Sequence, residues 1–254
     1  MKIGILSAMP EENNLISSKI EQRSVTSLGT RDYVEGTLAG KKVIAAFSRW
    51  GKVAAAQAAT TMITKFGAEK IIFTGVAGAA SPELEIGDVV IGRDLIQHDM
   101  DASAIPAFQR FEIPLLGITH FKADHELIQI AEEAAREYLH TILSGDIPIS
   151  SLEKYGIHSP NIILGTIATG DQFIADEEKI RALRADIPNL KCIEMEGAAV
   201  AQVCHEHQVP FVVIRAISDK ANANAIHDFP HFVSSIVRHY SYGIVSGMLK
   251  KVNS

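Results

Sequence analysis

The feature that most constrains the fold of this chain is an alternation between short apolar runs and segments with helical periodicity. Short apolar runs are typical of strands buried on both faces, and helices between them allow such strands to pair in parallel. We expect strands at residues 2–8, 42–47, 70–73, 88–91, 162–168, 190–193 and 211–217, and helices at residues 53–66, 125–139, 177–184, 197–207 and 229–249. This pattern predicts an α/β fold, a three-layer α/β/α sandwich with a central mixed, mostly parallel twisted sheet.

The chain has 254 residues, and we expect a single domain over 1–254 because α/β folds of this length often have one core. Hydrophobic residues make up 47% of the chain and charged residues 21%, which allows a large core and gives no sign of disorder. Residues 140–160 are the least periodic part, interrupted by Gly145, Pro148, Gly156 and Pro160. This segment is predicted to be a long loop or insertion.

Charge and cysteine content exclude several classes of partner. The formal net charge of −6 argues against a nucleic acid or an anionic membrane as the main partner, since both usually require a basic face. The chain opens on a strand-like run without the pattern of a signal peptide, and no apolar segment reaches transmembrane length. Cys192 and Cys204 fit reduced thiols, with neither a disulfide nor a zinc role. We therefore expect a cytoplasmic protein.

Ionisable and other polar groups interrupt or follow the last two expected strands. They are Glu194, Glu196, Arg215, Ser218 and Asp219. In open α/β sheets the ligand site lies at the carboxyl ends of the strands, so we expect these groups to converge on one crevice. The alternative is that each of them caps a strand end in solvent.

Two further segments follow strands and could face the same crevice. Glu11 and Glu12 come after Pro10, where a helix can start and acidic residues suit its first turn. That capping role explains at least one of them, and a carboxylate facing the crevice could instead act as a general base for water. The small-residue turn at 74–78 suits close approach of backbone to a ligand, or simply tight packing. It lacks the spacing of a phosphate-binding or dinucleotide-binding loop.

The sequence gives no support for a metal, a cofactor or a covalent intermediate. Among the ten histidines, His227 and His231 have the spacing of one helix face but no partnering carboxylate motif. Neither cysteine lies in a nucleophile setting, and there is no G-x-S-x-G motif. The remaining carboxylates, arginine and small-residue turns fit acid/base hydrolysis of a small polar molecule without metal or cofactor.

A combination of short motifs runs along nearly the whole chain. The motifs are MKIGI at 1–5, AM at 8–9 with EE at 11–12, GKVAAA at 51–56, TG at 74–75 with AG at 77–78, GD at 87–88, HD at 98–99, FKAD at 121–124, TGD at 169–171 with FI at 173–174, EME at 194–196, VPFVV at 209–213 and RAISD at 215–219. In this combination the chain resembles the 5'-methylthioadenosine/S-adenosylhomocysteine nucleosidases of the purine nucleoside phosphorylase and uridine phosphorylase superfamily.

The resemblance implies one nucleoside phosphorylase-like domain that hydrolyses the N-glycosidic bond of adenine thionucleosides, with a place in methionine salvage. By this resemblance Glu12 activates the attacking water, and Asp219 assists protonation of adenine N7 with support from Ser218. Met195 and Glu196 contact the ribose, Phe173 stacks on the adenine, the Ile174 backbone contacts the base edge, and Arg215 helps to hold the water. The residues expected to bind substrate are Trp50, Val76, Phe173, Ile174, Glu194, Met195, Glu196, Arg215, Ser218 and Phe229.

These roles are chemically coherent. An N-riboside cleaves through an oxocarbenium-like transition state, so carboxylates near the sugar stabilise developing positive charge while a proton on the base improves the leaving group. A protonated Asp219 can donate to N7 and accept from a 6-amino group, which favours adenine over a 6-oxo purine.

The chain departs from the usual family pattern near the pocket. Val76 stands where a serine is usual, and Trp50 replaces a smaller residue near the 5' substituent. The family's pocket is completed by an aromatic loop of the neighbouring subunit, which implies a homodimer. In this chain the corresponding segment is 100–108, where Ile105 or Phe108 could take the place of that aromatic.

Three other functions stay open at this point. A purine nucleoside phosphorylase would need an anion site, which Val76 weakens because valine supplies no side-chain donor. A hydrolase acting on a futalosine-type or adenosine-type substrate would use the same carboxylates. A nucleoside-binding protein without catalysis would not need a water-activating base at Glu12.

Overall fold

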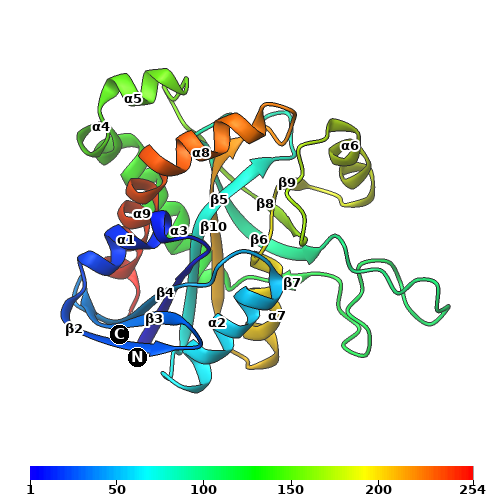
Figure 1. Ribbon diagram of the computed structural model, residues 1–254, viewed down its shortest axis with the longest axis horizontal. Helices are drawn as coiled ribbons and strands as arrows, with labels where there is room; N and C mark the ends of the chain where they lie inside the picture. Colours follow the sequence, from blue (N-terminus) through cyan, green and yellow to red (C-terminus); the bar gives the residue numbers. More distant parts are fainter. Residues whose placement is uncertain (254) are drawn as a thin grey trace.

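Helices cover both faces of a central sheet in this computed structural model, which describes residues 1–253 (Figure 1). Within those residues ten strands form the sheet: β1 (Lys2–Ser7), β2 (Glu21–Leu28), β3 (Arg31–Leu38), β4 (Lys41–Phe47), β5 (Lys70–Ala79), β6 (Val89–Gln97), β7 (Phe121–Lys122), β8 (Ile162–Thr169), β9 (Leu190–Glu194) and β10 (Phe211–Asp219). The helices are α1 (Pro10–Ser18), α2 (Lys52–Thr64), α3 (His125–Glu137), the π-helix η1 (Tyr138–Ile142), α4 (Leu143–Asp146), α5 (Ile149–Lys154), α6 (Glu177–Asp186), α7 (Gly197–Glu206), α8 (Ala225–Ser235) and α9 (Val237–Lys251).

Two buried apolar clusters on opposite faces of the sheet hold the helices in place. Helices α1, α3 and α9 contribute Ile16, Leu127 and Ile244 to one cluster. Helices α2 and α7 contribute Ala59 and Val200 to the other. These side chains recur on one face of each helix, which is why the sequence predicts those helices as coverings for the sheet. The predicted α/β/α fold class is confirmed.

The sheet is mixed, and part of it curls into a ring. Parallel pairings join β4 to β1, β1 to β5, β5 to β10, β6 to β8 and β8 to β9. Antiparallel pairings join β10 to β6 and β9 to β5, so β5, β10, β6, β8 and β9 form a closed circuit of neighbours. The curl draws the carboxyl ends of β5, β9 and β10 together. The candidate site lies at those ends.

The hairpin near the N-terminus and the helices near the C-terminus differ from the sequence-based expectation. Strands β2 and β3 form an antiparallel hairpin that the sequence did not predict. Its outer strand β2 is almost entirely exposed, so it lacks the apolar run that marks a buried strand. The single helix expected over 229–249 is two helices, α8 and α9, which meet at Ile236.

The prediction of a long loop at residues 140–160 is wrong, because the segment is largely helical. The π-helix η1 continues α3, and α4 and α5 follow. Burial of Leu139, Leu143 and Leu152 stabilises these short helices although the local pattern is interrupted. Pro148 does not break a helix because it lies at the N-cap of α5, and the exposed Gly145 lies in the one-turn helix α4.

No helix among residues 1–253 is both long enough and apolar enough to cross a lipid bilayer.

Candidate active site

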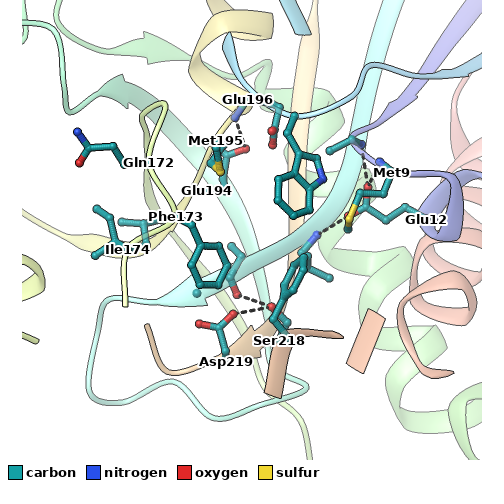
Figure 2. A pocket seen from close by; sticks show the side chains of 17 residues that line it. Met9, Glu12, Gln172, Phe173, Ile174, Glu194, Met195, Glu196, Ser218 and Asp219 are labelled. Atoms are coloured by element: carbon teal, nitrogen blue, oxygen red, sulfur yellow. Dashed lines mark hydrogen bonds between the residues drawn. The ribbon is translucent and has the colours of Figure 1, made fainter. Parts of the chain in front are cut away.

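A cavity opens where β5, β9 and β10 end, and it encloses about 550 Å³ including space open to solvent. Its lining residues are Ala8, Met9, Glu12, Trp50, Val76, Ala77, Gly78, Gln172, Phe173, Ile174, Ile193, Glu194, Met195, Glu196, Ser218, Asp219 and Phe229. Figure 2 shows Glu12 and Met9 on one side of this space and Gln172 and Ile174 on the opposite side. Four polar groups of the lining, Glu12, Glu194, Glu196 and Asp219, are carboxyl groups that are at most 8% exposed.

Glu12 lies in the first turn of α1, where its carboxylate accepts three backbone hydrogen bonds. Its Oε2 accepts from the N–H groups of Ala8 at 2.7 Å and Met9 at 2.9 Å, and its Oε1 accepts from Val76 N–H at 3.1 Å. Burial raises the pKa of Glu12 to about 7, while the charge of Arg215 and these N–H groups oppose part of that rise. The group is therefore fixed in space and can exchange a proton near neutral pH.

Glycine at position 75 makes room for that carboxylate. A Cβ at Gly75 would lie 2.7 Å from Glu12 Oε1 and 3.3 Å from Arg215 Nη1. Both distances are shorter than ordinary contacts, so any side chain here would displace the carboxylate. The turn predicted at 74–78 is wrong, because these small residues continue strand β5, and Gly75 within the strand serves the packing of Glu12.

Arg215 does not reach the cavity, although the resemblance implied a role in holding water. Its side chain is 1% exposed and lies beneath the site, with the guanidinium carbon 4.0 Å from the centre of the Phe73 ring. Its Nη2 forms an ion pair with Glu194 Oε2 at 2.6 Å. Strand β10 is covered on both faces, and the arginine side chain is enclosed within the protein. Arg215 therefore affects the site through its ion pair with Glu194 and through the electric field of its own positive charge.

Glu194 receives hydrogen bonds from the start of α7 as well as from Arg215. The N–H of Glu196 donates to its Oε2 at 3.1 Å, and the N–H of Gly197 donates to both carboxylate oxygens, at 2.9 and 2.7 Å. The hydroxyl of Thr169 donates to Oε1. Helix N-termini attract anions, so Glu194 caps α7 while it neutralises Arg215.

Glu196 is almost fully buried and accepts a hydrogen bond from Gly51 N–H at 2.8 Å. Burial and the nearby charge of Glu194 raise the pKa of Glu196 to about 8, while the Gly51 N–H and Arg215 act in the opposite direction. Two carboxyl groups of the same site thus titrate near neutral pH, a property that is common at functional sites.

Asp219 and Ser218 end β10 at a shift in its pairing with β5 between Ile217 and Asp219. Such bulges redirect side chains, and here both residues line the cavity. The Ser218 hydroxyl donates to Asp219 Oδ2 at 2.8 Å (Figure 2), and Ala221 N–H donates to Oδ1 at 2.8 Å. Burial raises the pKa of Asp219 above its usual range, against the effect of these two donors.

Three aromatic side chains from separate segments line the apolar part of the cavity. Phe229 of α8 contacts both Phe173 and Trp50 edge to face, with ring centres 5.6 and 5.9 Å apart. Trp50 is 52% exposed and Phe173 is 44% exposed, so both stand at the open side. Stacking surfaces of this kind suit a planar ligand with an apolar extension.

Every site residue predicted from the sequence lines this cavity except Arg215. Residues that the site predictions omitted include Met9, Gln172 and Ile193. Met9 already lies in the AM motif at 8–9, and Gln172 and Ile193 are direct chain neighbours of the predicted positions Phe173 and Glu194, so the motifs and their neighbours would have found all three. Among residues 1–253 no group of three His, Cys, Asp or Glu side chains is arranged to hold a metal ion.

Comparison with known proteins gives the family. Residues 2–250 match the family model of the phosphorylase superfamily. The chain is 36% identical over 245 residues to the 5'-methylthioadenosine/S-adenosylhomocysteine nucleosidase of Bacillus cytotoxicus, covering 96% of this chain and 97% of that one. The chain belongs to the 5'-methylthioadenosine/S-adenosylhomocysteine nucleosidase family.

Solved structures of similar proteins agree with membership of this nucleosidase family. The enzyme of Neisseria meningitidis in complex with methylthio-immucillin-A is 32% identical with a TM-score of 0.87, and the match covers 99% of both chains. The futalosine hydrolase of Helicobacter pylori is 30% identical with a TM-score of 0.84, covering 99% of this chain and 98% of that one. The same fold is therefore found in enzymes that are named for different substrates.

Proposed function

We propose that this chain hydrolyses the N-glycosidic bond of 5'-methylthioadenosine and S-adenosylhomocysteine, releasing adenine and the corresponding thioribose. The observation that carries this proposal is the presence of three buried carboxyl groups with raised pKa values, Glu12, Glu196 and Asp219, around one cavity. Relatives with the same fold that are named for this activity support it.

Glu12 is the proposed general base. Its three N–H donors hold the carboxylate in one orientation, and a base with a pKa of about 7 takes a proton readily at neutral pH while still being partly ionised. Water that attacks the anomeric carbon would give its proton to this carboxylate. Val76 lines the cavity with an apolar side chain, so only its backbone N–H contributes here.

Glu196 is proposed to bind the sugar. In its ionised form it accepts hydrogen bonds from ribose hydroxyls and stabilises the positive charge that develops on the sugar as the bond breaks. Met195 lines the same region and supplies apolar contact. Arg215 acts from beneath, since its pair with Glu194 keeps the net charge under the sugar close to zero.

Asp219 is proposed to assist protonation of the leaving adenine. Its raised pKa favours the protonated form, which can donate to N7, and the Ser218 hydroxyl fixes the orientation of the carboxyl group. The Phe173 ring offers a face for the base, and Ile174 lies next to it on the wall of the cavity. Base release as a neutral molecule lowers the barrier for bond cleavage.

Hydrolysis is favoured over phosphorolysis by the charge of the cavity. Within the described residues its lining contains no Lys, Arg or His side chain, whereas it contains four carboxyl groups. A phosphate dianion next to those groups would be repelled. A futalosine-type substrate remains the second candidate because of the similar fold of the Helicobacter pylori hydrolase.

We also propose a homodimer. The loop between β6 and β7 extends away from the body of the protein (Figure 1), and it carries the apolar side chains of Ile105 and Leu115, which are 55% and 96% exposed. A second copy would cover them. A monomeric mass at micromolar concentration in analytical ultracentrifugation would contradict this.

The cytoplasmic location stays a prediction.

The experiment that tests the function measures adenine release from methylthioadenosine, adenosylhomocysteine and adenosine, with and without phosphate. We expect release that does not depend on phosphate and that Glu12→Gln and Asp219→Asn each reduce by at least about 100-fold. Glu11→Gln is the matched control, since Glu11 is exposed and is not among the cavity residues. Release that requires phosphate would indicate a purine nucleoside phosphorylase instead. Release of a base only from futalosine would indicate a futalosine hydrolase.

A further inference from the structure

The N-terminus of α2 lies beside the cavity and is capped by carboxylates from other elements. Helix α2 begins at Lys52 with Gly51 as its N-cap, so it has no side-chain cap of its own and no acidic residue in its first turn. Gly51 N–H donates to Glu196 Oε1, and Lys52 N–H donates to Asp171 Oδ1, both at 2.8 Å. Glu196 and Asp171 therefore satisfy donors that a helix start otherwise leaves to solvent.

A third carboxylate ties this helix start to two further strand ends. Asp99, just after β6, accepts from Lys52 Nζ at 2.6 Å and from Asp171 N–H at 2.8 Å. The Lys52 and Asp99 side chains are 17% and 20% exposed, so solvent screens this ion pair less than a surface pair. Lys52 Nζ also donates to Gln97 at 3.2 Å. Segments that follow β4, β6 and β8 are thus joined by one set of charges.

Two glycines let these segments approach so closely. Gly51 has a φ of +92°, and a Cβ there would lie 3.0 Å from Asp171 Oδ1. A Cβ at Gly170 would lie 2.4 Å from the His98 ring and 3.1 Å from Asp99 Cγ. Three of the motifs therefore meet at one place: GK at 51–52, TGD at 169–171 and HD at 98–99. The proposed catalytic roles do not involve the residues at this place.

The joined segments carry cavity residues. Trp50 directly precedes Gly51, and Phe173 follows Asp171 by two residues. We propose that Lys52, Asp99 and Asp171 form a positioning network that holds the start of α2 against Glu196 and fixes the segments carrying Trp50 and Phe173. The network touches no substrate atom and acts through Glu196, so this inference rests on the proposed function of that residue.

The charges around Glu196 make it sensitive to this network. Glu194 from β9 and Glu12 from α1 oppose its ionisation, while Arg215 from β10 and the Gly51 N–H favour it. Next to Asp99, burial lowers the pKa of His98, which favours the neutral ring over a competing positive charge. Losing the Gly51 N–H contact should therefore raise the pH at which Glu196 ionises.

The decisive variant is Asp171→Ala, compared with Asp171→Asn, whose side-chain oxygen can still accept from Lys52 N–H. For Asp171→Ala we expect the acidic limb of the kcat/KM profile to move up by about one pH unit and kcat to fall about tenfold. Asp171→Asn should stay close to the wild type. Asp124→Ala is the matched control, because it removes the side-chain cap of α3, which lies outside the cavity lining.

A second readout does not depend on activity. Trp50 is the only tryptophan, so the intrinsic fluorescence anisotropy reports the segment before α2. Anisotropy should fall in Asp171→Ala and stay unchanged in Asp171→Asn and Asp124→Ala.

If Asp171→Ala does not fold, Lys52→Met should show the same two changes. An unmoved acidic limb together with unchanged anisotropy would overturn the network. Failure of the wild type to release adenine would overturn the proposed function, and the anisotropy would still decide on the network.

Discussion

Removing the buried cation Arg215 should cost both stability and activity, through the ion pair beneath the cavity. The substitution Arg215→Met keeps most of the side-chain volume and deletes the guanidinium, which is 2.6 Å from Glu194 in a pair whose side chains are 1% and 3% exposed. Glu194 would then be a buried carboxylate without its cation. Breaking such a pair costs about 3–5 kcal/mol, which corresponds to a fall in melting temperature of roughly 10 °C for a chain of this size.

The same substitution should change the pH dependence of the reaction. Burial raises the pKa of Glu12, and the charge of Arg215 is the largest influence that opposes this rise. Without that charge Glu12 holds its proton to higher pH, so the acidic limb of the kcat/KM profile should move upward. Rates of adenine release between pH 5 and pH 9 would measure this, alongside calorimetry of thermal unfolding.

Two controls make the result interpretable. Lys70→Met removes a cation from a pair 3.2 Å from Glu126 in which the carboxylate is 50% exposed to solvent, and it should cost no more than about 1 kcal/mol. Adding Glu194→Gln to Arg215→Met should recover part of the loss, because no unpaired charge then remains. A stability loss for Arg215→Met as small as that for Lys70→Met would refute the reasoning. It would mean that water or another group neutralises Glu194.

Three further results are expected. Gly75→Ala should lower kcat by about 100-fold with little change in KM, because the new methyl group would lie 2.7 Å from Glu12 Oε1; an active variant in steady-state assays would contradict this. In the wild type kcat/KM should fall as the pH drops, first below about 8, where Glu196 takes up its proton, and then below about 7, where Glu12 does; a profile that is flat from pH 5 to 9 would exclude both roles. Trp50→Leu removes the edge contact with Phe229 at the cavity mouth, and it should raise kcat/KM for adenosylhomocysteine relative to methylthioadenosine in a competition assay.

Much of the fold was predictable because strands and helices leave local periodic patterns. Each apolar run that the sequence marked as a strand matches one, two of them running one residue beyond it, since burial on both faces requires such a run. Strand β2 escaped prediction because it is exposed and pairs only with β3, so its pattern is polar. The helices within 140–160 escaped because their stability comes from burial of a few leucines and not from local propensity.

The candidate site was predictable in its composition but not in its geometry. Ionisable groups at strand ends stand out in a sequence because burying them needs a reason. Glu12, Glu196 and Asp219 could therefore be named as candidates from the chain alone, with roles that the family resemblance supplied. Arg215 shows the limit of such a prediction. Its position near Ser218 and Asp219 in the sequence suggests that it lines the cavity, but its side chain is buried beneath the cavity and pairs with Glu194.

The sequence by itself determined much of the order of strands and helices and the chemical groups available at the strand ends. Only the tertiary structure decided which of those groups meet. The curl of the sheet brings β5, β9 and β10 together, and Asp171 caps a helix that starts 119 residues earlier in the chain. Contacts of that kind depend on how distant segments pack. Local patterns carry no record of them, because periodicity reports which face of a segment is buried and not what covers it.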